Sequence, residues 1–145
     1  SVTSRLYFPA QKKEVTISDT IGFIKDLPSS LIESFKSTLM ESVHADVLLQ
    51  IIDISDPEMN EKISVVQRIL QELQVQAKKT IFVFNKIDAF KGDGKKILKE
   101  IKEKYSQFSP VFISATTDYG IEKLKNQIEK ELFLWNVHVQ FVVDI

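Results

Sequence analysis

The sequence predicts an α/β fold in which a mostly parallel sheet carries helices on both faces. Two near-continuous apolar runs of strand length, Asp46–Ile54 and Thr80–Phe84, are typical of strands that are covered on both faces. Segments with apolar residues at helical spacing follow both runs. This alternation of strand and helix indicates one sheet packed between two layers of helices.

The first third of the chain predicts a hairpin followed by a loop and a helix. Two short β-prone runs, Arg5–Phe8 and Glu14–Ser18, flank a polar turn, so we expect antiparallel strands there. A loop is expected over residues 19–26. Ser30 and the residue three positions later have the capping-box spacing of a helix start, and apolar residues at helical spacing continue to Val43.

The remaining elements follow in the same rhythm. Asp56 and Pro57 are expected to be the N-cap and the first residue of a helix. Further on, the apolar spacing predicts helices at 95–105 and 121–134, with a strand at 111–113 between them. Residues 137–143 then alternate between apolar and polar side chains, which predicts a terminal strand, either at a sheet edge or at the start of a further domain.

The composition is that of a single compact domain, and it excludes or disfavours several kinds of site and partner. The 145 residues, 43% of them hydrophobic, suffice for one compact domain. Nineteen Lys and Arg against twenty Asp and Glu give a net charge of -1, which offers no field that favours DNA or an anionic membrane as a partner. There is no cysteine, so disulfides and thiolate metal sites are excluded. No apolar run is long enough to cross a bilayer, and we expect a soluble, cytoplasmic protein.

The loop after the strand at Thr80–Phe84 carries the most specific motif. Asn85, Lys86 and Asp88 form the N-K-x-D pattern of guanine-specific proteins. A carboxylate at Asp88 can accept hydrogen bonds from both the ring N–H and the exocyclic amine of guanine, which adenine cannot supply. In this pattern Asn85 steadies the loop and contacts the base, and the stem of Lys86 packs on the ring.

Two weaker motifs complete an ordered set. Ser114 and Ala115 follow the strand at 111–113 and match the S-A motif, whose backbone N–H reads the guanine carbonyl oxygen. Asp19 and Gly22 match D-x-x-G, in which the carboxylate holds Mg²⁺ through water and the glycine N–H contacts the terminal phosphate of GTP. Ligands bind at the carboxyl ends of strands in open α/β sheets, and all three motifs lie there.

The stretch DTIGFIKDLP at Asp19–Pro28, with its continuation to Leu39, resembles the second switch region of HflX-family GTPases. The resemblance extends to about Leu134. It implies a P-loop GTPase fold of three layers that binds GTP or GDP with Mg²⁺, hydrolyses GTP and acts at the large ribosomal subunit. Phe23 stands where Ras-like enzymes place the glutamine that positions water, so the resemblance implies slow hydrolysis that depends on a partner. The alternative role for Phe23 is packing of the loop against the following helix.

One part of the family pattern is missing from the sequence. Its four glycines, at positions 22, 92, 94 and 120, start no G-x-x-x-x-G-K-[ST] segment. We therefore expect residues 1–134 to be a partial GTPase domain, from the end of the first switch onward and without the first strand and phosphate loop. Residues 135–145 would be an additional C-terminal strand. Hydrolysis of GTP by this chain alone is not expected.

Two other features favour plain structural roles. Asp53 ends an apolar strand and could be taken for a catalytic carboxylate, but its place before a helix start favours a capping or loop-fixing role. The lysines between Lys91 and Lys104 are interspersed with acidic residues, which favours a solvated helix face over an RNA-binding patch. Two hypotheses thus remain: a GTP-binding, GTP-hydrolysing HflX-type protein, or a GTPase-like binding module without catalysis.

Overall fold

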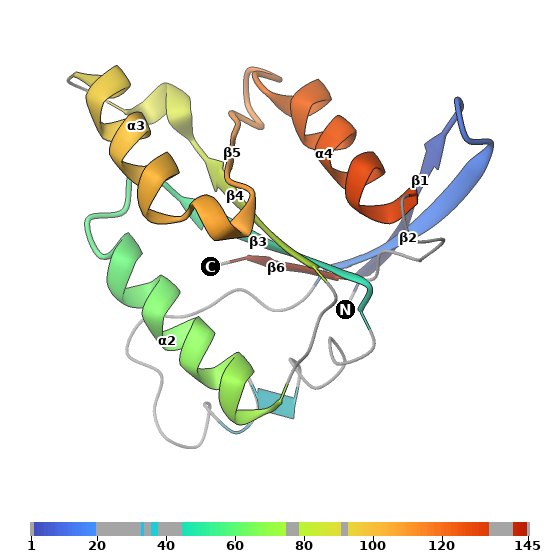
Figure 1. The fold of residues 1–145 in the computed structure, drawn as a ribbon, viewed down its shortest axis with the longest axis horizontal. Helices are drawn as coiled ribbons and strands as arrows, with labels where there is room; N and C mark the ends of the chain where they lie inside the picture. The colour runs from blue at the N-terminus through green and yellow to red at the C-terminus, as the bar shows by residue number, and fades with distance from the viewer. Residues whose placement is uncertain are drawn as a thin grey trace.

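The computed structural model describes residues 2–19, 33, 36–37, 45–74, 79–90, 93–133 and 141–144. These residues form one six-stranded sheet in the order β1-β2-β6-β3-β4-β5 (Figure 1). The strands β2, β6, β3, β4 and β5 run parallel to one another, and β1 is antiparallel to β2. The predicted α/β class with a mostly parallel sheet is confirmed.

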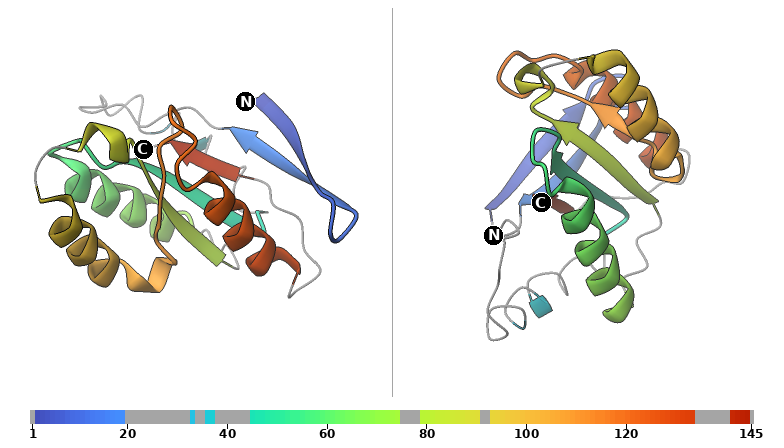
Figure 2. Two further views of the ribbon diagram at one scale, coloured as in Figure 1. Left: turned by 90° about the horizontal axis from the view of Figure 1, so that it is seen from above. Right: turned by 90° about the vertical axis from the view of Figure 1, so that its left-hand side faces the viewer.

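The hairpin at the start of the chain is confirmed. β1 (Val2–Phe8) pairs with β2 (Lys13–Asp19) over seven residues each. The backbone N–H of Lys12 donates to the carbonyl oxygen of Pro9 at 3.2 Å and closes the turn between them. Figure 2 shows the hairpin projecting beyond the rest of the sheet. The carboxyl end of β2, opposite the turn, is therefore the end that is relevant to the candidate site.

The centre of the sheet consists of strands buried on both faces. β3 (Val47–Asp53) pairs with β4 (Lys79–Asn85) along its full length, and the short β5 (Val111–Phe112) continues the sheet beyond β4. On β4, Phe82 and its neighbour Val83 are both 0% exposed although they point to opposite faces. A continuous apolar run is the pattern that such a strand requires.

Helices cover both faces and make the structure three-layered (Figure 1). α2 (Met59–Glu72) and α3 (Gly94–Lys104) pack on one face, in a cluster that includes the aromatic rings of β4. α4 (Ile121–Phe133) packs on the other, through Ile128 and Leu132. Short 3₁₀ turns at Ile87–Ala89 and Ser106–Phe108 complete the description. In the described part of the chain, no helix is long and apolar enough to span a membrane.

The start of α2 differs from its prediction. Asp56 was expected to be the N-cap and Pro57 the first helical residue, but the helix begins at Met59 after a turn. The Asp56 carboxylate accepts the backbone N–H of Glu58 at 2.9 Å, and its carbonyl oxygen accepts that of Met59 at 3.1 Å. Asp56 thus satisfies N–H groups of the preceding turn. The helix predicted up to Val43 falls on residues of which the structure describes only 33, 36 and 37.

The last strand lies inside the sheet. β6 (Phe141–Asp144) runs parallel between β2 and β3, where Phe141 is the Cα partner of Ser18 on one side and of Leu48 on the other. The interpretation of this segment as an edge strand is therefore wrong. Residues 137–140 of the predicted strand lie outside the described residues, and the division of the chain at residue 134 stays a prediction.

Candidate nucleotide-binding site

The candidate site lies where the parallel strands end. Asn85 is the last residue of β4, and Lys86 follows it in the left-handed conformation, with a φ of 69°. A 3₁₀ turn then carries Asp88. The positive φ turns the chain sharply at the end of the strand, so the motif forms a compact loop at the carboxyl edge of the sheet.

Asn85 joins this loop to the one after β5. Its Oδ1 atom accepts the backbone N–H of Lys86 at 2.8 Å and that of Ala115 at 3.0 Å. One side-chain oxygen thus fixes two loops that are 30 residues apart in the sequence. The backbone N–H of Ala115, predicted to read a carbonyl oxygen, thus already donates to Asn85.

Asp88 is held by the second loop. The hydroxyl of Ser114 donates to Oδ1 of Asp88 at 2.6 Å, and the same hydroxyl oxygen accepts the backbone N–H of Thr117 at 3.2 Å. Ser114 is fully buried, whereas Asp88 is exposed. The hydroxyl therefore orients a carboxylate that solvent, and hence a ligand, can reach.

Backbone hydrogen bonds fix the two loops to the sheet. The N–H of Ile113 donates to Phe84 at 2.8 Å, and the N–H of Ile87 donates to Ile113 at 3.2 Å. The N–H of Ser114 donates to the carbonyl oxygen of Tyr119 at 3.0 Å and closes the second loop. The structure thus brings together all five residues predicted to read the base, namely Asn85, Lys86, Asp88, Ser114 and Ala115.

The phosphate side of the predicted site is described only in part. Asp19 is exposed at the carboxyl end of β2, at the same edge of the sheet as the base-reading loops. Three strand spacings separate β2 from β4, which corresponds to about 14 Å. Gly22 and Phe23 lie outside the described residues, so their predicted roles stay predictions.

Sequence reasoning gave Asp53 a loop-fixing role, and the structure confirms it. Oδ1 of Asp53 accepts the backbone N–H of Ser55 at 2.9 Å and its hydroxyl at 2.6 Å. A second contact was missed: Nζ of Lys86 donates to the other oxygen, Oδ2, at 2.7 Å. Burial alone would raise the pKa of Asp53, but the hydrogen bonds from Lys86 and Ser55 outweigh it and hold the pKa below its ordinary value.

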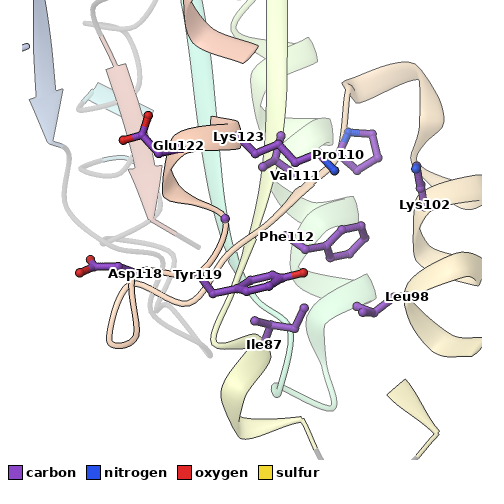
Figure 3. A pocket seen from close by; sticks show the side chains of 11 residues that line it. Ile87, Leu98, Lys102, Pro110, Val111, Phe112, Asp118, Tyr119, Glu122 and Lys123 are labelled. Carbon is purple, nitrogen blue, oxygen red and sulfur yellow. The ribbon is translucent and has the colours of Figure 1, made fainter. Parts of the chain in front are cut away.

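A hollow of about 600 Å³ lies beside β5, between α3 and the start of α4. Figure 3 shows Ile87, Leu98, Phe112 and Tyr119 around it, with Lys102 further along. None of the five base-reading residues lines this hollow. It is therefore separate from the candidate base site, although Ile87 of the N-K-x-D loop forms part of its wall.

Comparison with known proteins decides the family. The sequence model of the family described as "50S ribosome-binding GTPase" matches residues 2–86. The chain belongs to this GTPase family. It is 39% identical over 97% of its length to the GTPase HflX of Caldanaerobacter subterraneus and 34% identical over 82% of its length to that of Escherichia coli. The resemblance to HflX proteins is therefore confirmed.

The chain spans less than a third of these relatives, 30% of the first and 27% of the second. Among solved structures it is similar to a GTP-binding protein from Sulfolobus solfataricus in complex with GDP. That similarity has a TM-score of 0.75 and 28% identity, and it covers 90% of this chain and 44% of the other. A three-layer fold like that of P-loop GTPases is thus shown for the chain.

Proposed function

We propose that this chain binds guanine nucleotides through Asn85, Lys86, Asp88, Ser114 and Ala115. The contact that carries the proposal is the hydrogen bond from Ser114 to Asp88. It supports a carboxylate that is already oriented before a ligand binds. An exposed carboxylate needs no buried serine for its own stability, because water satisfies it. A fixed carboxylate, in contrast, pays less entropy when it binds a partner.

Base selectivity follows from the acceptor pattern. A carboxylate presents only acceptors, and guanine has two adjacent donors, the ring N–H and the exocyclic amine. Adenine presents a bare ring nitrogen at the corresponding position, which would leave the charge of Asp88 without a donor. Leaving a charged group unpaired costs more than leaving out a neutral hydrogen bond, so we expect strong preference for GDP and GTP over ATP.

Mg²⁺ is the metal ion that we assign to the phosphate side. The described residues contain no group of three or more His, Cys, Asp or Glu side chains that could hold a metal ion. Mg²⁺ commonly keeps several waters and takes one or two carboxylates together with phosphate oxygens. The single carboxylate of Asp19 fits that role, through water and in company with a nucleotide, and does not fit a site made of protein ligands alone.

The proposal extends to hydrolysis of GTP and binding to the ribosome. We assign this chain to a GTP-hydrolysing protein that acts at the large ribosomal subunit, as the description of its family supports. The cytoplasm is the location that this assignment implies. These 145 residues contain no phosphate-loop motif, so we expect no measurable hydrolysis of GTP by them alone. The same observation supports the second candidate, a GTPase-like module that binds partners without catalysis.

Calorimetric titration of the chain with GDP, GTP and ATP in the presence of Mg²⁺ tests the proposal. We expect binding of both guanine nucleotides and none of ATP. The matched pair of variants is Asp88→Asn and Asp118→Asn, which remove the same charge from two exposed positions. Loss of GDP binding in the first variant alone supports the assignment. Equal affinity for ATP, or an unchanged affinity in Asp88→Asn, would refute it.

A further inference from the structure

The contact between Lys86 and Asp53 links the base-reading loop to the neighbouring strand. Asp53 ends β3 and is the Cα partner of Asn85 at the end of β4. The backbone strengthens the link, since the N–H of Ile54 donates to the carbonyl oxygen of Asn85 at 3.0 Å. The Lys86 side chain crosses from one strand end to the other, and its ammonium group reaches Oδ2 of Asp53 at 2.7 Å.

Asp53 is a fixed anchor. Its other carboxylate oxygen is held by two donors of Ser55, and its own carbonyl oxygen accepts the backbone N–H of Asp56 at 3.2 Å. These bonds set the position of the carboxylate independently of Lys86. The Asp53 side chain is 27% exposed and that of Lys86 is 56% exposed. The flexible partner is thus the lysine, and the aspartate decides where its end lies.

Fold stability does not account for this arrangement. A solvent-accessible ion pair contributes little net stability, because the charges are screened and a long side chain must be ordered. Lys86 also occupies the left-handed backbone conformation, which is unfavourable for a residue with a side chain. The stem of Lys86 is fixed by the backbone at one end and by Asp53 at the other, and its CH₂ groups offer an apolar surface on which a planar base can pack.

We propose that Asp53 is a positioning residue of the nucleotide site, which holds the stem of Lys86 in the orientation that packs on the base. This inference rests on the proposed function, since it names how one of the base-contacting residues is oriented. Asp53 itself touches neither the base nor the phosphates. Its effect on affinity passes entirely through Lys86, and that dependence can be measured.

A double-mutant cycle on the full chain, with GDP and Mg²⁺ as the probe, measures it. Asp53→Asn keeps an oxygen that accepts from Ser55 but removes the charge that attracts the ammonium group. Ordering a lysine that Asp53 no longer holds costs rotamer entropy on binding, so we expect GDP affinity to fall about 5- to 10-fold. Lys86→Met keeps the apolar stem and removes the ammonium group. In that background Asp53→Asn should change the affinity by less than about 2-fold.

Asp93→Asn serves as the matched control, because it removes one negative charge from an exposed residue with no side-chain cap bond. Its GDP affinity should equal that of the wild type. If Asp53→Asn weakens binding equally in both backgrounds, Asp53 acts on the loop as a whole and the inference is wrong. An unchanged affinity in Asp53→Asn also overturns it.

Side-chain NMR relaxation of the lysines, without nucleotide, separates this inference from the proposed function. If the wild type binds no GDP, the proposed function fails, yet Lys86 should still be more ordered than the exposed Lys95 and should lose that order in Asp53→Asn. A Lys86 side chain as mobile as that of Lys95 in the wild type overturns the inference, whatever the binding result.

Discussion

Asp88→Asn tests the base-reading geometry most directly, because the structure predicts how the substituted amide will be oriented. The hydroxyl of Ser114 donates to Oδ1 of Asp88, because a carboxylate can only accept, and Ser114 is fully buried, so its O–H proton needs an acceptor there. In the variant, the serine therefore retains the amide oxygen at that position, and the NH₂ group takes the place of Oδ2. The variant presents one acceptor and one donor where the wild type presents two acceptors.

The expected loss follows from the hydrogen bonds. A hydrogen bond to a charged group contributes about 1.5–3 kcal/mol. If Oδ2 is the oxygen that faces the exocyclic amine of guanine, the variant loses that bond and sets its amide N–H against the amine. GDP should therefore bind about 10- to 100-fold more weakly. Xanthine carries an oxygen in place of the amine, so xanthosine diphosphate should bind the variant better than GDP does.

Calorimetric titration of the wild type and of Asp88→Asn with GDP and with xanthosine diphosphate measures this change of specificity. Asp118→Asn is the control, and it should keep the preference for GDP because Asp118 lines the hollow beside β5. If Asp88→Asn loses affinity for GDP and gains none for xanthosine diphosphate, the amide is not oriented by Ser114 as inferred. If the variant keeps its full affinity for GDP, the carboxylate does not read the base.

Four further substitutions, one of them a control, test other parts of the structure. Ser114→Ala removes the hydroxyl that donates to Asp88 and accepts the N–H of Thr117, so urea unfolding should show a loss of about 0.5–1.5 kcal/mol together with weaker GDP binding; unchanged stability would contradict the contact. Gly120→Ala should lower the melting temperature, because the residue has a φ of +74° and a Cβ there would lie 2.2 Å from the carbonyl oxygen of Phe112. Gly94→Ala, with 3.9 Å to the nearest atom, should not lower it. Hydrogen bonds from Lys62 and from the backbone N–H of Glu58 lower the pKa of Asp56 from 3.8. Their stabilisation is present above that pH and is lost as the pH falls through the lowered pKa. Asp56→Asn should therefore flatten the fall in the free energy of unfolding below about pH 4, as urea unfolding at several pH values would measure.

The sheet centre and the site were predictable because their signals are local. The apolar runs of β3 and β4 identify buried strands without any knowledge of their partners, and the motif residues follow directly at their carboxyl ends. Parallel strands end at one edge, so the loops with Asp88 and Ser114 were expected to flank one base, and the structure brings these side chains within 2.6 Å. Spacing and strand polarity suffice for such a prediction.

The contact between Asp53 and Lys86 was not predictable in the same way. The residues are 33 positions apart, and the contact depends on the register that makes Asp53 the partner of Asn85. A shift of one residue in that register would carry the aspartate to the other face of the sheet. The pattern of each strand shows where it is buried but leaves this register open, so the anchor of the lysine could be found only in the folded chain.

The interior position of β6 follows from hydrogen bonding in the sheet more than from its own pattern. β2 pairs with β1 on one side, and β3 pairs with β4 on one side, so the other edge of each strand faces a gap between them. Unpaired N–H and C=O groups at such edges are costly when water is excluded. Phe141–Asp144 fills the gap and pairs with both strands.

Alternation in the sequence predicts that a segment is a strand, but the unpaired edges of the neighbouring strands decide where it pairs. Since one edge pairs with one strand at a time, any other extended segment that entered this gap would have to displace residues 141–144.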